Sequence, residues 1–246
     1  MPVSETLIVA ILFFVGAALY ASVGHGGASS YLAVMGLFSF TPSVMKPTAL
    51  ALNILVAAVA TFKFYRAGLF SWRLFWPFAV ASIPAAFVGG AATLPARSYK
   101  ILVGVVLLYA AAWMFRSALR PLAKETHLPP LWAAVLAGLA IGFLSGLTGV
   151  GGGIFLSPLV LCMGWAETRA TSGIAAPFIL VNSIAGLLGH FSSIAQLPPN
   201  IPVWGVAAVL GGWIGASYGS KRAPAPVLRQ LLSLVLIVAG VKLIFY

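Results

Sequence analysis

Acidic side chains are almost missing from this sequence. Of its 246 residues, 3 are Asp or Glu and 14 are Lys or Arg, so that 7% of the chain is charged. A soluble domain of this size carries about 25% charged residues to cover its surface. A hydrophobic share of 61% and a mean hydropathy of +1.07 exclude an ordinary aqueous surface. The composition predicts an integral membrane protein.

Other absences exclude further classes of protein. The single cysteine, Cys162, rules out an intrachain disulfide. The motif H-E-x-x-H and metal-ligand clusters are missing, so we expect no enzyme, no cofactor and no bound metal. The apolar runs are continuous, which favours helices over a β-barrel. The net charge of +11 comes from scattered bases, which is typical of loops at an anionic membrane surface and not of a nucleic-acid-binding protein.

Ten apolar segments are expected to be helices in the membrane, where a full span takes about 20 residues. The first lacks the positive charge that precedes a signal-peptide core, because no Lys or Arg occurs before Lys46, and we count it as a span. The segments are residues 6–22, 28–40, 47–64, 74–94, 99–115, 131–146, 154–165, 171–193, 203–219 and 227–245. The most polar connection, residues 116–130, falls near mid-chain. We expect a first transmembrane repeat over residues 1–118, a central basic loop over 119–130 and a second transmembrane repeat over 131–246.

Two glycine-rich motifs indicate that the second half duplicates the first. Motif 1 is Gly24-His25-Gly26-Gly27-Ala28, and motif 2 is Gly149-Val150-Gly151-Gly152-Gly153. Each motif opens a short apolar segment and is followed by a cation and a threonine two residues apart, in Lys46-Pro47-Thr48 and in Arg169-Ala170-Thr171. Each half has an odd number of crossings, so the second half enters the membrane from the opposite side. The expected fold is an all-α polytopic membrane protein with two inverted-topology repeats of about five hydrophobic segments each and a site near the midplane between them.

The glycine motifs are the strongest candidates for a binding site. Consecutive glycines break a helix, at about 1 kcal/mol each relative to Ala, and a broken backbone in a membrane is tolerated only where it is buried in protein or lines a polar cavity. The segments that follow are too short for a full span, which predicts broken or re-entrant helices. Their N-termini would each offer about half a positive charge and together an anion site. Close helix packing is the alternative explanation of these glycines.

The candidate substrate-binding residues are Gly24, His25, Gly26, Gly27, Ser29, Ser30, Thr48, Asn53, Gly149, Gly151, Gly152, Gly153, Thr171, Ser172 and Asn182. The hydroxyls of Ser29 and Ser30 are placed to cap a helix or to bind ligand oxygens. Asn53 and Asn182 are amides in apolar segments that either hold helices together or face the substrate.

Three ionisable residues are further candidates for a functional role. Lys46 and Arg169 would steer anions toward the two mouths of the pathway, or would be ordinary interfacial cations. His25 would relay protons, although Val150 replaces it in motif 2.

The positions of the charges predict the sign of the substrate and an orientation. The three acids, Glu5, Glu125 and Glu167, lie outside the deep parts of the segments, so we expect a small anionic substrate. A proton and a sodium ion both remain candidate coupling ions, and the oligomeric state stays open. One side of the membrane receives Lys63, Arg66, Arg73, Arg116, Arg120, Lys124, Arg169, Lys221, Arg222 and Arg229, and the other receives Lys46, Arg97, Lys100 and Lys242. The larger set predicts the cytoplasmic side, with both termini outside.

The two glycine motifs, each followed by its Lys/Arg-x-Thr segment, resemble those of the TauE/SafE family of sulfite and sulfonate exporters, and the likeness covers essentially the whole chain. The resemblance implies an inner-membrane secondary transporter of sulfite, an organosulfonate or a related organosulfur or carboxylate compound. The alternatives are a passive anion channel on the same scaffold and a membrane protein without transport activity. The two motifs differ from one another, since His25 and Ala28 stand where the second has Val150 and Gly153.

Overall fold

The computed structural model describes residues 3–117, 126–191, 197–221 and 226–245. Within these ranges the regular structure is helical, without strands. The helices are α1 (Val3–Ala21), α2 (Ala28–Leu37), α3 (Pro42–Arg66), α4 (Trp72–Ala91), α5 (Ala96–Ser117), α6 (Leu131–Thr148), α7 (Gly153–Cys162), α8 (Thr168–Gly189), α9 (Ile201–Gly219) and α10 (Pro226–Phe245). Seven of them, α1, α3, α4, α5, α6, α8 and α9, are long and apolar enough to cross a membrane. The prediction of an all-α polytopic membrane protein is confirmed.

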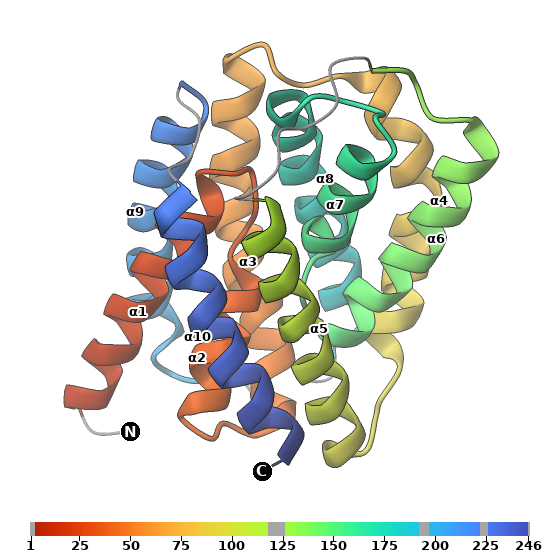
Figure 1. Ribbon diagram of the computed structural model, residues 1–246. Helices are drawn as coiled ribbons and strands as arrows, with labels where there is room; N and C mark the ends of the chain where they lie inside the picture. Colours follow the sequence, from red (N-terminus) through yellow and green to blue (C-terminus); the bar gives the residue numbers. More distant parts are fainter. Residues whose placement is uncertain (1–2, 118–125, 192–196, 222–225, 246) are drawn as a thin grey trace.

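The two short helices each form a hairpin with the helix before them. A helix of 10 residues, as in α2 and α7, is about 15 Å long, half the thickness of the apolar core of a bilayer. The chain after α2 returns to the start of α1, because Phe40 packs on Trp204, whose Nε1 donates to the carbonyl of Thr6 at 3.2 Å. The chain after α7 returns to the start of α6, where the N–H of His127 donates to the carbonyl of Gly164. In Figure 1 the α1–α2 hairpin rises from the lower face and the α6–α7 hairpin descends from the upper one.

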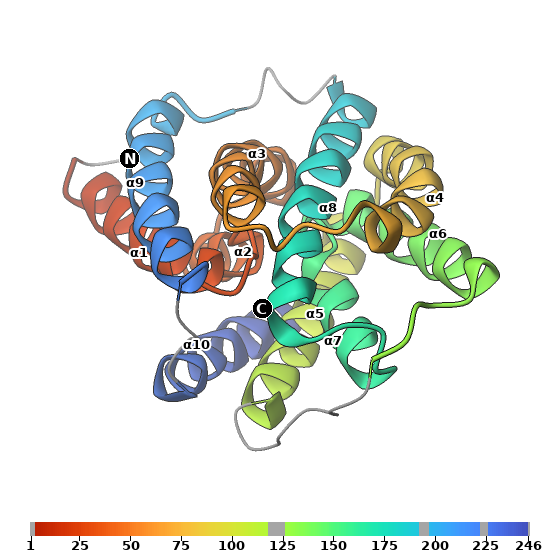
Figure 2. The same cartoon turned by 90° about the horizontal axis from the view of Figure 1, so that it is seen from above.

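The two halves exchange partners when they pack. The fourth helix of each half lies along the first helix of the other, α4 along α6 and α9 along α1, and the two fifth helices, α5 and α10, lie along each other. Helices α3 and α8 contact each other, and each also contacts the fourth helix of the other half. Figure 2 shows α3 and α8 between the outer pairs α1–α9 and α4–α6. The glycine motifs join α1 to α2 and α6 to α7, and their first residues, Gly24 and Gly149, lie against α8 and α3, so both motifs are held inside the bundle.

Glycines let the exchanged helices approach closely. On α6, Gly138, Gly142 and Gly146 face α4, and on α9, Gly211, Gly215 and Gly219 face α1. A Cβ at any of the six would overlap a carbonyl oxygen of the facing helix. Such small-residue stripes replace the hydrophobic effect as the source of helix association in lipid, where close van der Waals packing is the main attraction.

Two helix boundaries differ from expectation by more than three residues. Helix α3 begins at Pro42, five residues before the expected start, because Thr41 is extended and a proline is favourable at the first position of a helix. Lys46 and Pro47 therefore lie inside the helix and not ahead of it. Helix α8 ends at Gly189, four residues before the expected end, and His190 is its cap. Most of the central loop, including Arg120, Lys124 and Glu125, lies outside the described residues, as does Arg222.

The glycine stripe yields a matched pair of stability variants. Gly142→Ala places a methyl group against the backbone carbonyl of Ser82, whereas at Gly205 the added Cβ meets only the Leu55 side chain, at 3.3 Å. Both changes raise helix propensity equally, so their difference isolates the α4–α6 contact. Overpacking against a rigid backbone costs about 1–3 kcal/mol. We expect Gly142→Ala to have a lower melting temperature in detergent than Gly205→Ala. An equal or higher melting temperature of Gly142→Ala would contradict the close contact.

Candidate functional site

The two glycine motifs meet around the side chain of Asn53, which is fully buried in α3. Its Oδ1 accepts a hydrogen bond from the N–H of Ala28, the first residue of α2, at 3.1 Å. Its Nδ2 donates to the carbonyl of Val150 in motif 2 and to the hydroxyl of Ser183 in α8, both at 3.2 Å. One amide thus joins motif 1, motif 2 and the two central helices. Asn53 therefore holds helices together, and its role in substrate binding stays a prediction.

Glycine is required where the motifs approach this amide. A Cβ at Gly26 would overlap Oδ1 of Asn53, and one at Gly151 would overlap its Nδ2. Gly151 also has a φ of +83°, which residues with a side chain rarely adopt. The outer glycine of each motif rests on the central helix of the other half. A Cβ at Gly24 would overlap the backbone of Ser172, and one at Gly149 would lie 3.2 Å from the carbonyl oxygen of Lys46.

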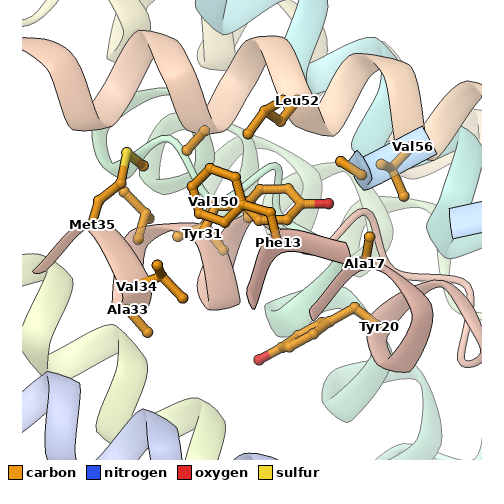
Figure 3. Packing of buried hydrophobic residues seen from close by; sticks show 14 of the residues in the cluster. Phe13, Ala17, Tyr20, Tyr31, Ala33, Val34, Met35, Leu52, Val56 and Val150 are labelled. Atoms are coloured by element: carbon orange, nitrogen blue, oxygen red, sulfur yellow. The ribbon is translucent and has the colours of Figure 1, made fainter. Parts of the chain in front are cut away.

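The N-terminal ends of α2 and α7 both lie inside the bundle. Their caps, Gly27 and Gly152, have φ values of 99° and 85° and contribute no side-chain hydrogen bond. Each end therefore presents its partial positive charge through backbone N–H groups. Figure 3 shows Val150 of motif 2 in the core cluster with Tyr31 of α2 and Phe13 of α1. The two helix ends are thus set among residues of both halves.

His25 makes a second bond between the halves. Its Nε2 lies 2.8 Å from the hydroxyl of Ser157 in α7, and its ring is half-buried. A Cβ at Gly153 would lie 3.3 Å from the same ring. Motif 1 therefore contacts the helix that follows motif 2, and the glycine at the start of α7 leaves room for this imidazole.

The predicted hydroxyl residues fall into two groups. The hydroxyls of Ser30 and Ser172 donate to carbonyls of their own chain segments, those of Gly27 and Thr168. The expectation that Ser29 or Ser30 caps α2 is wrong, because α2 has no side-chain cap. Thr48 and Thr171, by contrast, are buried with hydroxyls that have no hydrogen-bond partner.

Asn182 differs from Asn53. It is fully buried in α8, its Nδ2 donates to the carbonyl of Phe178 in the same helix, and its Oδ1 has no partner. A buried amide that reaches only its own backbone does not join helices. The two halves therefore place their intramembrane amides in unlike environments.

Lys46 and Arg169 have the same contact in each half. Each lies near the start of a central helix and binds carbonyls at the C-terminal end of the helix that follows it. The ammonium of Lys46 donates to Gly90 at 2.8 Å, Ala92 at 3.2 Å and Gly89 at 3.3 Å, at the end of α4. Nη2 of Arg169 donates to the carbonyl of Ser220, the cap of α9, at 2.8 Å. A cation is favourable there because the last carbonyls of a helix lack partners and carry partial negative charge.

Two cavities lie along the motifs. A cavity of about 10 Å³ is lined by residues of both motifs, including His25 and Val150, together with Tyr20 and Ile179, and is the size of about one water molecule. A cavity of about 480 Å³ lies on the face where α3 begins and α4 ends. Its wall includes Lys46, Thr93, Tyr99, Leu147 and His190. Among the described residues, no residue lines both cavities.

Several residues of this site carry no strong sequence signal. Ser157 and Ser183 bond to His25 and Asn53, and each is a single hydroxyl in an apolar segment. Tyr99, whose hydroxyl donates to the carbonyl of Thr148 just before motif 2, is 49 residues away in the chain. Ser183 adjoins Asn182, and this polar pair is the one local signal that marks it.

Broken helices whose N-termini meet inside a polytopic bundle define a class, the membrane transporters with discontinuous helices. The family described as sulfite exporter TauE/SafE matches residues 8–243, and the chain belongs to this family. It is 44% identical to the probable membrane transporter protein y4hK of Sinorhizobium fredii, over 98% of this chain and 99% of that one. It is 28% identical to the probable membrane transporter protein YjnA of Bacillus subtilis, over 94% of this chain and 96% of that one. The resemblance seen in the two motifs is confirmed.

The two amides give a second matched pair of variants. Asn53→Leu leaves the Ala28 N–H and the Val150 carbonyl without their partner, at about 1–3 kcal/mol for each buried group. Asn182→Leu removes an amide whose Oδ1 is already unpaired. We expect Asn53→Leu to lower the melting temperature strongly and Asn182→Leu to leave it unchanged or higher. The reverse order in a thermal-shift measurement would contradict the central role of Asn53.

Proposed function

We propose that this chain is a secondary transporter that moves a small anion across the cell inner membrane by alternating access. The substrate is sulfite, an organosulfonate or a related organosulfur or carboxylate compound. The observation that carries the proposal is the meeting of the two glycine motifs at Asn53, with the N-terminal ends of α2 and α7 inside the bundle. Membership of the TauE/SafE family supports the class of substrate.

The charges near the motifs support an anion. Lys46 and His190 line the larger cavity, and His25 lines the smaller one. Within the part of the chain that the structure describes, neither cavity has a carboxylate in its wall. Glu5 lies in the first turn of α1 and Glu167 caps α8, both at helix ends, and Glu125 lies outside the described residues. A cation or proton pathway in a membrane is usually built on such acids, and an anion pathway does not need them.

The exchange of helices between the halves supports alternating access. We infer that the halves are inverted repeats, because α1–α2 and α6–α7 enter from opposite faces and the partner exchange occurs in both. The larger cavity reaches Lys46 and Leu147, next to motif 2, while the motifs enclose space for about one water. This conformation corresponds to a state that is closed at the substrate site and open toward the face where α1 begins.

The basic residues support the orientation. Six members of the larger set, Lys63, Arg66, Arg73, Arg116, Arg169 and Lys221, lie at or next to helix ends on the face opposite to the start of α1. Lys46, Arg97, Lys100 and Lys242 lie toward the other face. By the positive-inside rule the first face is cytoplasmic and the termini are outside.

The site is tested by Gly152→Val in proteoliposomes loaded with sulfite or methanesulfonate. Gly152 has a φ of +85° and a Cβ there would lie 3.0 Å from Phe178 and 3.1 Å from Ile141, so a branched side chain obstructs the start of α7. We expect flux to fall to the rate of empty liposomes while the protein still elutes as a folded species. Gly205→Ala is the control and should keep wild-type flux. Normal flux from Gly152→Val would disprove this assignment of the site.

The mode of transport is tested on the same liposomes. A carrier gives saturable flux. Substrate on the opposite side accelerates this flux, because in each turnover the binding site must return to the side from which it is loaded. A passive channel gives unitary currents in a planar bilayer and no such acceleration. We expect the carrier result, and unitary currents would replace alternating access by a channel mechanism.

A further inference from the structure

The larger cavity has an unusual wall for the outer part of a membrane bundle. Its volume is about 480 Å³, within the range of about 300–1,000 Å³ of small-molecule sites. Five elements meet there, the start of α3, the end of α4, the start of α5, the end of α6 and the cap of α8. The polar side chains in the wall are Thr41, Ser43, Lys46, Thr93, Tyr99 and His190. Among the described residues the wall has one cation, Lys46, together with hydroxyls and an imidazole, and it has no carboxylate, so its charge favours an oxyanion.

Lys46 is fixed in this wall by the backbone of α4. It is 4% exposed, and its three contacts are the carbonyls of Gly89, Gly90 and Ala92. The backbone of Lys46 in turn lies next to Gly149, the first residue of motif 2. A ligand in the cavity that attracts the ammonium therefore acts on the same residue that adjoins the closed substrate site.

His190 faces the same cavity from the end of α8. Burial lowers the pKa of His190 below its usual value, the nearby Lys46 ammonium lowers it further, and a hydrogen bond to the carbonyl of Gly90 offsets part of this. The shift favours the neutral imidazole. The other charged or titratable groups in the wall are Lys46 from α3 and Tyr99 from α5, while α4 presents carbonyls and α6 presents Leu147.

We propose that this cavity is a second binding site, which takes up a small oxyanion from the face where the termini lie, and that His190 takes up a proton when the anion binds. The anion lies between the Lys46 ammonium and the imidazole. An acid dissolved in the surrounding water transfers its proton to the unprotonated ring nitrogen of His190. An N–H bond forms on the ring, and the acid becomes its conjugate base. This inference rests on the proposed function and adds to it a binding step and a coupling ion.

The sign of the effect follows from linkage. A bound anion favours the imidazolium over the imidazole, so the pKa of His190 is higher with the anion bound than without it. Binding then takes up a proton, and anion affinity rises as pH falls. The dissociation constant changes by at most about tenfold per pH unit for one linked proton. The effect is confined to the range between the two pKa values of His190.

The test measures methanesulfonate binding by calorimetry in uncharged detergent, between about pH 5 and pH 7, within the range where histidine titrates. A sulfonate stays ionised over this range, so a linked proton belongs to the protein, and sulfonate buffers are avoided. We expect the wild-type dissociation constant to increase with pH. His190→Gln keeps a hydrogen-bond donor but does not titrate, and its dissociation constant should be independent of pH. A flat wild-type profile, or a His190→Gln profile as steep as the wild type, would overturn the proposal.

Two further variants locate the site. Thr93→Trp fills the cavity from an exposed position in its wall and should weaken binding by at least about tenfold, a loss of about 1.4 kcal/mol. Arg97→Gln is the matched control, because Arg97 is an exposed base in the first turn of the same α5 but is not part of the wall. It should keep both the affinity and the pH dependence. Wild-type binding by Thr93→Trp would exclude this cavity.

A lipid headgroup carries the same oxyanion chemistry, and a second arm separates the two sources. If phosphatidylglycerol binds and soluble sulfonate does not displace it, the cavity is a lipid site and the proposal is wrong. Transport then distinguishes this inference from the proposed function. If the rate of methanesulfonate uptake does not depend on a pH gradient, the role of His190 is rejected and the proposed transport function is not. Absence of uptake of every sulfonate, carboxylate and sulfite tested would reject the proposed function itself.

Discussion

The hydrogen bonds of one buried amide hold the broken helices of this protein together. Where a helix is interrupted inside a membrane bundle, its free N–H and carbonyl groups have no water to bind, and each unpaired group costs several kcal/mol. Asn53 satisfies one such group in each glycine motif and a hydroxyl of α8 at the same time. This is possible only because Gly26 and Gly151 have no side chain in the space of the amide. The motifs, the hairpins and the central pair α3–α8 all depend on that arrangement.

The two halves share an architecture but not a chemistry. Both place a cation of the central helix on the last carbonyls of the helix that follows it, through Lys46 in one half and Arg169 in the other. Both leave a buried threonine hydroxyl unpaired, on Thr48 and Thr171. Yet His25 has no counterpart in motif 2, and Asn182 does not join helices as Asn53 does. If the proposed function is correct, a substrate between the motifs would meet different groups from each half, which would orient an asymmetric anion such as a sulfonate.

Local sequence was a good guide wherever the signal was local. The glycine motifs, the short helices after them and the near absence of acids each follow from residue type and spacing, so the broken helices at residues 24–28 and 149–153 could be predicted. Boundaries were less accurate, since Pro47 looked like a helix start although Pro42 opens α3. Contacts between segments that lie far apart in the sequence could not be predicted from it. The bond from His25 to Ser157 joins residues that are 132 positions apart. The bonds of Lys46 to the end of α4 join residues that are 43 to 46 positions apart.

The sequence by itself determined that this chain lies in a membrane, that its halves match and that its helices break at the glycine motifs. Those properties depend on hydropathy and on the cost of glycine in a helix, which are fixed residue by residue. The tertiary structure decided that the fourth helix of each half packs on the first helix of the other and that the motifs close around Asn53. It also brought Lys46 and His190 to one cavity. These depend on which helix surfaces fit against each other, and no single segment of the chain contains that information.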